Sequence, residues 1–208
     1  MGIPLSTIDS MGRTEAALLR KLKIEDEHFI EIESKRRVNP DQFGKVRKHL
    51  MTHEDVDHVK KVSFFDQFLD TPGMLLFKRG ASMRIRYKSN GKRVYLQYKG
   101  PGFRKNGLLY RSEFSTGNIS HLIPEESHHD VIEFSEATVQ ELLHEHAPGP
   151  MRNAMSTHLT KSVMKKINRG VILSIYEKNK FEVQLGDGVM VVVVVVVRNV
   201  ELGDLVLG

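Results

Sequence analysis

The sequence contains no cysteine among its 208 residues. This absence excludes a disulfide framework, a cysteine nucleophile and a metal site built on thiolates. It also agrees with the reducing conditions of the cytoplasm, where we expect the protein to be found.

Long hydrophobic runs are scarce as well. The longest, residues 189–197, has nine residues, whereas a membrane-spanning helix needs about 20. The N-terminus has no apolar run of the signal-peptide kind. We therefore expect a soluble protein with no membrane partner. The β-branched residues of the C-terminal run predict a strand or a strand pair there.

Length and composition are those of an ordinary folded domain. Apolar residues make up 40% of the chain and charged residues 27%, and a chain of this length can build one sizeable core. We expect a domain at residues 27–208, preceded by an extension at residues 1–26 and carrying a helical insertion at about residues 119–168. The net charge of +5 favours an anionic partner, without separating nucleic acid, a membrane surface and a small phosphorylated ligand.

The spacing of apolar residues predicts helices outside the strands. They are expected at residues 14–23, at residues 40–50, from Ser135 to about residue 146, and in a further stretch that ends at about residue 166. Residues 60–68 are expected to be extended and to end in the turn Asp70-Thr71-Pro72-Gly73.

The segment "SMRIRYKSNGKRVYLQYKG", residues 82–100, predicts a β-hairpin. Asn90-Gly91 favours a two-residue turn, because both central residues of a type I′ turn need positive φ. This turn would set Arg86 opposite Tyr95 and Arg84 opposite Gln97. One face of the hairpin would then be apolar and the other basic.

The segment "HFIEIESKRR", residues 28–37, places Glu31, Glu33 and Lys35 at alternate positions. Neighbouring carboxylates on one strand face repel each other unless a cation lies between them. Such a pair suits Mg²⁺ or Mn²⁺, which take oxygen ligands. Arg84 and Arg86 would supply planar donors for phosphate oxygens.

Two interpretations of these charged faces remain open from the pattern alone. In the first, the charged face of a half-buried strand simply meets water. In the second, the strands form an antiparallel barrel whose charged face points inward around a polyanion.

Several motifs in order along the chain resemble the CYTH domains, the triphosphate tunnel metalloenzymes. Glu31-Ile32-Glu33-Ser34-Lys35 resembles their E-x-E-x-K signature. It is followed by "FFDQFLDTPGMLLFKRGASMRIR", "VYLQYKGP" and "YRSEFS", which resemble successive strands of the family. The match runs from about Phe29 to Gln184. The resemblance implies an α+β fold, mainly antiparallel β, in which an eight-stranded barrel forms a tunnel with helices packed outside.

The resemblance also implies roles for individual residues. The implied metal ligands, for Mg²⁺ or Mn²⁺, are Glu31, Glu33, Glu113, Asp187 and Glu201. The implied phosphate contacts are Lys35, Arg84, Arg86, Lys99, Arg111 and Arg169, and the first four of these are also the implied catalytic residues. The family usually has a second E-x-E on its last metal-binding strand, whereas this chain has Asn199-Val200-Glu201 and so one acid fewer.

The function implied by the resemblance is metal-dependent hydrolysis of inorganic triphosphate, thiamine triphosphate or a nucleoside triphosphate, which makes the chain an enzyme with a small-molecule partner. An adenylate cyclase of the class IV type, making cyclic AMP from ATP, is an alternative. A catalytically weak module that binds polyphosphate is another. Nucleic acid is not an expected partner, because a tunnel prefers short triphosphates and excludes duplexes. A homodimer is left open.

Overall fold

The computed structural model describes residues 16–34, 39–53, 56–88, 93–122, 136–167, 169–185 and 189–201. Within these ranges, side chains are described except at residues 40, 47, 57–63, 136, 169–185 and 189–201.

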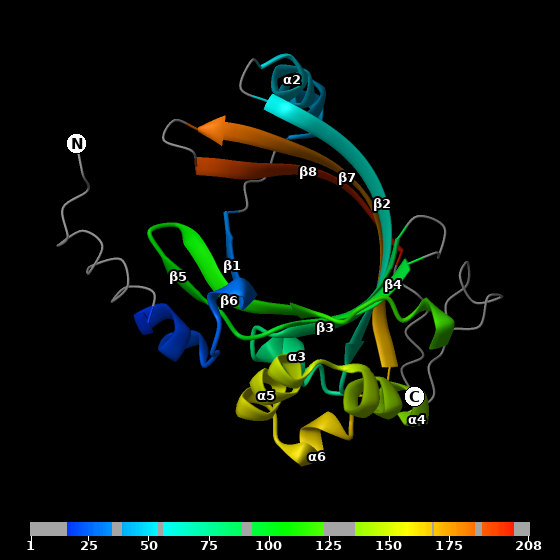
Figure 1. Ribbon diagram of the computed structural model, residues 1–208. Helices are drawn as coiled ribbons and strands as arrows, with labels where there is room; N and C mark the ends of the chain where they lie inside the picture. The colour runs from blue at the N-terminus through cyan, green and yellow to red at the C-terminus, as the bar shows by residue number, and fades with distance from the viewer. Residues whose placement is uncertain are drawn as a thin grey trace.

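The strands of the chain form one antiparallel sheet that curls strongly (Figure 1). In chain order they are β1 (Ile30–Glu33), β2 (Val56–Asp70), β3 (Ser82–Lys88), β4 (Arg93–Lys99), β5 (Phe103–Lys105), β6 (Leu108–Ser115), β7 (Arg169–Leu185) and β8 (Val189–Glu201). Their order in the sheet is β1-β6-β4-β3-β2-β7-β8, and β5 pairs with β6 outside this path. The register between β2 and β7 shifts at Val56/His58 and at Phe68/Leu69. Such irregularities bend and twist the long strands.

The predicted α+β class with mainly antiparallel strands is confirmed, whereas the closed barrel is not observed. The sheet begins at β1 and ends at β8, and no pairing between these two strands occurs among the described residues. The architecture in the described part of the chain is therefore an open, strongly curved sheet.

The β3–β4 hairpin has the predicted register. Arg86 pairs with Tyr95 and Arg84 with Gln97, as a two-residue loop at Asn90-Gly91 requires, although that loop lies outside the described residues. The two faces of the hairpin separate as expected. The apolar face consists of buried side chains, namely Met83, Ile85, Tyr87, Val94, Leu96 and Tyr98.

The helices are α2 (Pro40–Thr52), α3 (Leu75–Lys78), α4 (Glu136–Glu141), α5 (Gly149–His158) and α6 (Lys161–Met164), with short turns η1 (Glu27–Phe29), η2 (Ser120–Leu122) and η4 (Leu142–His146). Residues 16–22 are also helical. Helix α2 confirms the helix predicted at residues 40–50, and Pro40 occupies its first turn, where the missing N–H costs nothing. None of the described helices is long and apolar enough to cross a bilayer.

The helical segment between β6 and β7 differs from the prediction in two details. The helix predicted to end near residue 146 does so, but its last turn, η4, has π-helical hydrogen bonding. The single helix expected to reach residue 166 is instead two helices, α5 and α6. They are separated at Leu159 and Thr160, where the Thr160 hydroxyl accepts a hydrogen bond from the Val163 N–H and caps α6.

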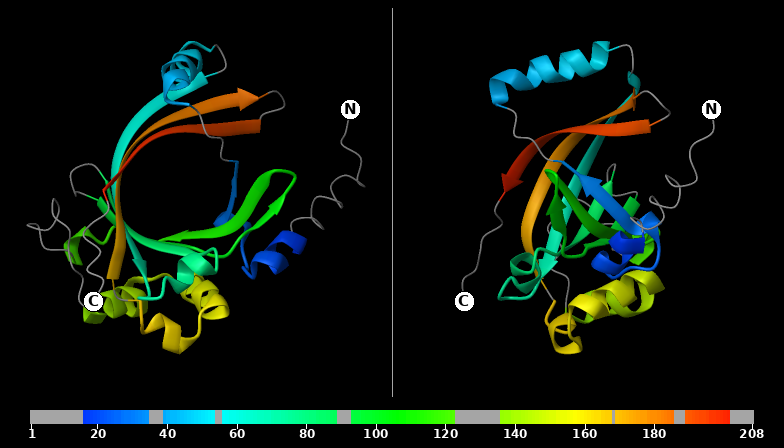
Figure 2. Two further views of the ribbon diagram at one scale, coloured as in Figure 1. Left: turned by 180° about the vertical axis from the view of Figure 1, so that it is seen from behind. Right: turned by 90° about the vertical axis from the view of Figure 1, so that its left-hand side faces the viewer.

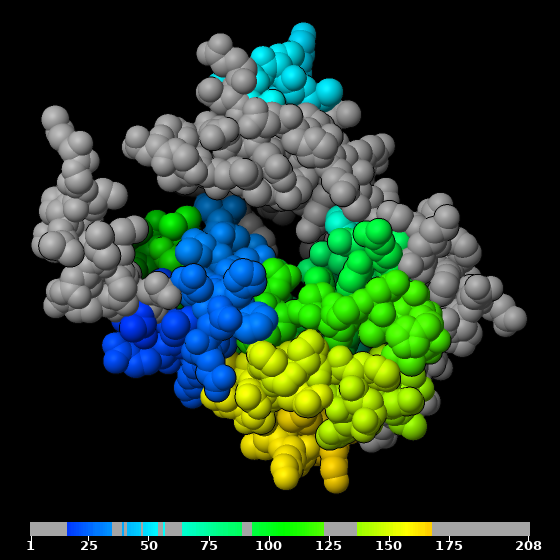
Figure 3. All heavy atoms as spheres, viewed as in Figure 1, coloured from blue at the N-terminus to red at the C-terminus, as the bar shows by residue number. Residues whose placement is uncertain are grey.

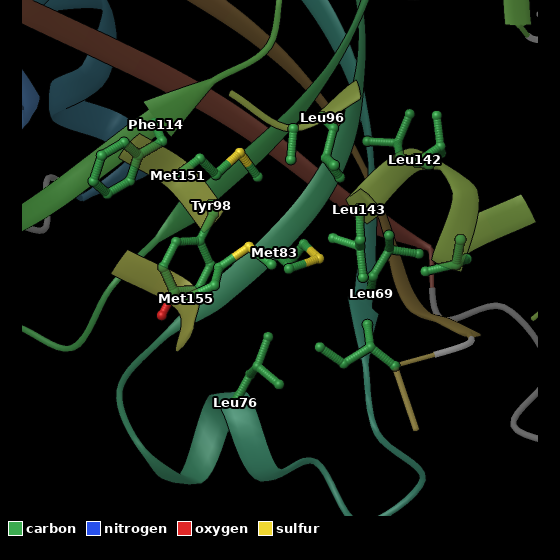
Figure 4. Close-up of a cluster of buried hydrophobic side chains, with 14 of the residues drawn as sticks. Leu69, Leu76, Met83, Leu96, Tyr98, Phe114, Leu142, Leu143, Met151 and Met155 are labelled. Atoms are coloured by element: carbon green, nitrogen blue, oxygen red, sulfur yellow. The ribbon is translucent and has the colours of Figure 1, made fainter. Parts of the chain in front are cut away.

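Helices α3 to α6 cover the apolar face of the hairpin, on the convex side of the sheet, while α2 lies at the opposite end of the molecule (Figures 1 and 2). Leu142 and Leu143 of η4 and Met151 and Met155 of α5 pack with Met83, Leu96 and Tyr98 in one core (Figure 4). In the space-filling view, α5 and α6 form a continuous surface (yellow) beside the N-terminal segment (blue) (Figure 3). Because the apolar face packs outward against helices, the charged face of the hairpin lies on the concave side.

The turn after β2 is fixed by a buried carboxylate. Asp70 accepts hydrogen bonds at Oδ1 from the N–H groups of Thr71 and Leu76, at 2.6 and 2.9 Å, and at Oδ2 from that of Phe77, at 3.0 Å. The N–H groups of Leu76 and Phe77 lie in the first turn of α3, where they would otherwise have no intrahelical partner. Asp70 therefore determines how β2 turns into α3, as the predicted turn requires.

Candidate functional site

The charged side chains of the concave face come from neighbouring strands and oppose one another across the sheet. Glu31 on β1 lies opposite Arg111 on β6, and Lys99 on β4 lies opposite Glu113 on β6. Directly opposed side chains have Cβ atoms about 5 Å apart, close enough for opposite charges to pair. Strand alternation thus brings acids and bases together along the concave face.

Glu31 contacts two basic side chains of this face. Its oxygens accept hydrogen bonds from Lys99 Nζ, at 2.6 and 2.7 Å, and from Arg111 Nε, at 2.6 Å. Burial by itself raises the pKa of the Glu31 carboxyl, but Lys99 and Arg111 outweigh it and lower the pKa from 4.5 to about 2. Glu31 is therefore ionised throughout the physiological range.

Lys99 is buried and contacts two acids, with Glu113 Oε1 at 3.2 Å from its Nζ. Burial lowers the pKa of Lys99, against the opposing effects of Glu113 and Glu31, and the net change is a decrease. The two carboxylates therefore do not fully offset the cost of burying this charge. A further anion beside Lys99 would stabilise its charged form.

Asp66 on β2 belongs to the same face, and sequence reasoning did not single it out. It is fully buried, and its oxygens accept hydrogen bonds at 2.7 Å from Arg86 Nε and from Arg86 Nη2. Arg84 Nη1 lies 3.0 Å from Asp66 Oδ2. The sequence signal was a single acid within the aromatic run "FFDQF", at the parity that opposes Arg86 in the observed register.

The ion pairs join into one chain of alternating charge. Arg111 Nη2 contacts Glu33 at 2.6 Å, and Arg84 Nη2 lies 3.7 Å from Glu113. The chain runs in the order Glu33, Arg111, Glu31, Lys99, Glu113, Arg84, Asp66, Arg86. Four cations face four carboxylates, so the formal charge of this network is zero.

The network is largely shielded from water. The side chains of Arg84 and Arg111 are 12% and 14% exposed, and that of Glu31 is 23% exposed. The interpretation in which these strand faces simply meet bulk water is therefore wrong for these residues. The charged face points inward, as the second interpretation expects.

The network contains seven of the predicted site residues, namely Glu31, Glu33, Arg84, Arg86, Lys99, Arg111 and Glu113. The side chains of the other four predicted residues lie outside the described part of the structure. Lys35 and Asp187 lie outside the described residues. Arg169 begins β7 and Glu201 ends β8, and the side chains of these strands are not among those described.

The donor chemistry of the acids suits a divalent cation. Glu31 and Glu33 lie on the same side of β1, and both contact Arg111. Carboxylate oxygens are the ligands that Mg²⁺ and Mn²⁺ prefer. In the described part of the chain, however, no group of three or more acidic, histidine or cysteine side chains is arranged to hold a metal ion. The carboxylates are thus of the right chemical type to bind a divalent cation, but in this structure they form ion pairs with lysine and arginine.

One comparison with known proteins agrees with the motifs. The family model described as CYTH domain matches residues 30–185. A search of curated protein sequences finds no match.

The solved structures similar to the chain include three proteins from different organisms. One, from Hippeastrum, is described as a proposed adenylyl cyclase with a dominant triphosphatase activity. It is 13% identical to this chain, the match covers 80% of this chain and 79% of that chain, and the TM-score is 0.49. The second is a proposed adenylate cyclase from Bacillus halodurans, 14% identical over 83% of this chain and 76% of that chain, with a TM-score of 0.42. The third is a proposed adenylate cyclase from Vibrio parahaemolyticus, 14% identical over 79% of this chain and 73% of that chain, with a TM-score of 0.34.

Proposed function

Because this chain belongs to the CYTH domain family, we propose that it hydrolyses a triphosphate with the help of a divalent cation. The observation that carries the proposal is the continuous network of four basic and four acidic side chains on the concave face. Inorganic triphosphate, thiamine triphosphate and nucleoside triphosphates all present the phosphate chain that such donors recognise.

The basic residues of the network bind the phosphate oxygens. Arg84, Arg86 and Arg111 offer planar guanidinium groups that can make paired hydrogen bonds with phosphate. Lys99 contributes a compact charge, and its lowered pKa means that a phosphate oxygen beside it relieves part of its burial cost. Lys35 and Arg169 are proposed as further contacts. Together these groups offset the negative charge that develops on the phosphate during its transfer.

Charge balance explains why a divalent cation is needed. The described network is formally neutral, whereas a triphosphate adds several negative charges. Glu31, Glu33 and Glu113 would hold Mg²⁺ or Mn²⁺, with Asp187 and Glu201 as further ligands. When bound, the cation would withdraw charge from the phosphate oxygens as a Lewis acid.

In the present ion pairs, a basic side chain that binds phosphate must give up its contact with a carboxylate. Glu31 now accepts hydrogen bonds from Lys99 and Arg111. If these two cations turn to phosphate oxygens, the Glu31 carboxylate loses its donors. A partly buried carboxylate without a partner is unfavourable, so it then gains from a metal ion.

A module that binds polyphosphate without turnover is the second candidate. It is favoured by the lack of a ready group of three metal-binding side chains among the described residues and by the missing acid at Asn199. This candidate predicts affinity for inorganic triphosphate without phosphate release under any cation.

The experiment is phosphate release from inorganic triphosphate, thiamine triphosphate and ATP, with Mg²⁺, with Mn²⁺ and with a chelator. We expect release with a cation and none with the chelator. The Glu31→Gln variant should lose the activity, and Glu145→Gln, at an exposed position on η4, should keep it. With ATP, cyclic AMP and pyrophosphate in place of phosphate would instead identify a cyclase. Binding without any product would support the polyphosphate module and contradict the hydrolase.

A further inference from the structure

Asp66 is the most deeply buried residue of the ion-pair network. It has no solvent exposure, and burying a carboxylate is costly unless charged partners surround it. Its partners are Arg86, through two hydrogen bonds of 2.7 Å, and Arg84, at 3.0 Å. The cost of this burial is therefore offset by the two arginines that the proposed function assigns to phosphate.

The contacts fix the planes of both guanidinium groups. Arg86 uses Nε and Nη2 on the two oxygens of Asp66, a paired arrangement with a single orientation. The Arg86 guanidinium also lies over the ring of Phe64, 4.4 Å from its centroid. Arg84 is held by Asp66 at Nη1 and by the Gln97 amide oxygen at Nε, 2.9 Å away.

We infer that Asp66 is a positioning residue, which presets Arg84 and Arg86 for the oxygens of a phosphate chain. The inference rests on the proposed function, since it gives the two arginines a phosphate ligand. Asp66 acts through them and need not touch the substrate. Side chains ordered before binding lose less conformational entropy when the ligand arrives, so preorganisation improves affinity.

Neutralising Asp66 should change triphosphate affinity in opposite directions, depending on whether Asp66 acts through its charge or by orienting the two arginines. The Asp66→Asn variant makes the network one unit more positive, and on charge alone a polyanion should bind more tightly. If Asp66 serves to orient the arginines, the same substitution should weaken binding despite the added positive charge. The direction of the change therefore separates the two roles.

The experiment compares Asp66→Asn and Asp66→Glu with the wild type and with Asp70→Asn. Asp70 is a matched control, because it is also buried on β2 but accepts its hydrogen bonds from the N–H and hydroxyl of Thr71 and from two N–H groups in the first turn of α3. The measurements are the Kd of inorganic triphosphate by calorimetry with and without Mg²⁺, kcat and KM for its hydrolysis, and the melting temperature. The arginine Nε–H signals in ¹⁵N NMR report guanidinium ordering without any substrate.

We expect both Asp66 variants to lower kcat/KM by about 10- to 100-fold, mostly through KM. In the wild type we expect a slowly exchanging Arg86 Nε–H signal, because this group donates to Asp66, and the signal should disappear in Asp66→Asn. Asp70→Asn should lower the melting temperature and leave Kd, KM and the Nε–H signals close to those of the wild type. Should Asp66→Asn not fold, Asp66→Glu carries the same test, because it keeps the charge and displaces the carboxylate by one methylene.

Unchanged or tighter triphosphate binding in the folded Asp66 variants would overturn the inference, as would an Arg86 Nε–H signal that persists in Asp66→Asn. Failure of the proposed function has a different signature. If the wild type binds inorganic triphosphate but releases no phosphate, the hydrolase is wrong and the inference is still decided by Kd. If the wild type does not bind it at all, both are overturned.

Discussion

Lys99 on β4 donates from Nζ to both carboxylate oxygens of Glu31 on β1, at 2.6 and 2.7 Å. The two strands do not pair with each other. Instead, β1 and β4 pair with successive parts of β6, residues 109–112 and 113–115. The contact therefore ties the edge strand β1 to the body of the sheet through side chains, and it places Glu31 where three strands meet.

The first prediction concerns Arg111, which bridges the two acids of β1. It contacts Glu31 through Nε and Glu33 through Nη2, each at 2.6 Å. Lysine keeps the charge but has no planar fork with which to hold two carboxylates. We expect Arg111→Lys to lower kcat/KM for inorganic triphosphate by about 10- to 100-fold, measured by steady-state phosphate release.

The control is Arg152→Lys. Arg152 is exposed on α5 and donates to the backbone carbonyls of His144 and Ala147. It lies outside the network, so its replacement should leave kcat/KM near the wild-type value. Equal losses in the two variants would mean that Arg111 acts on general stability and not on the site.

The second prediction concerns the acid stability of the protein. The folded pKa of Glu31, about 2, lies below the ordinary value of 4.5. A depressed folded pKa contributes stability that is fully present above about pH 4.5 and is lost as the pH falls toward about 2. Chemical denaturation in this window should show the wild type losing about 2 kcal/mol more free energy of unfolding than Glu31→Gln.

Glu145→Gln serves as the reference for this measurement, because Glu145 is exposed and outside the network. Its pH profile should run parallel to that of the wild type. Parallel profiles for the wild type and Glu31→Gln would show that the Glu31 pairing with Lys99 and Arg111 contributes nothing to acid stability.

Local sequence rules predicted the β3–β4 hairpin because one short turn fixes every pair in it. Asn90-Gly91 determines the register, and the register then determines that Arg84 and Arg86 share a face with Lys99. The residues of the site on β1 and β6 followed from alternation and from the resemblance to the CYTH domains. Alternation and the family motifs can each be identified within the sequence of a single strand.

The contact between Asp66 and Arg86 was not predicted, because the connection between their strands, β2 and β3, is too long to fix the register. The link from β2 to β3 contains α3 and a turn held by Asp70, so no two-residue loop gives the register between these strands. Only the observed pairing of Asp66 with Arg86 reveals the contact.

The register of β8 could not be predicted for a different reason. Its repeated valines make neighbouring registers nearly equivalent in side-chain pattern. The structure pairs Val194 with Lys180 and Asn199 with Ile175. Nothing in a run of identical residues distinguishes this pairing from one shifted by two positions.

The third prediction uses two glycines in contrasting surroundings. A Cβ atom on Gly102, between β4 and β5, would lie 2.7 Å from the Tyr110 carbonyl oxygen and 3.0 Å from Arg111 Cβ. Backbone must therefore move, and it would displace the residue that bridges Glu31 and Glu33. We expect Gly102→Ala to lower the free energy of unfolding by about 1–3 kcal/mol and to lower kcat/KM as well.

Gly44 in helix α2 is the matched counterpart, because a Cβ atom there meets nothing within 4 Å. Alanine stabilises a helix interior by about 0.5–1 kcal/mol relative to glycine. Gly44→Ala should therefore raise the free energy of unfolding, measured by denaturant titration, and leave kcat/KM unchanged. Wild-type stability and activity in Gly102→Ala would contradict this prediction. The connection between β4 and β5 could then shift without moving Arg111, and its close packing would not be what holds Arg111 in place.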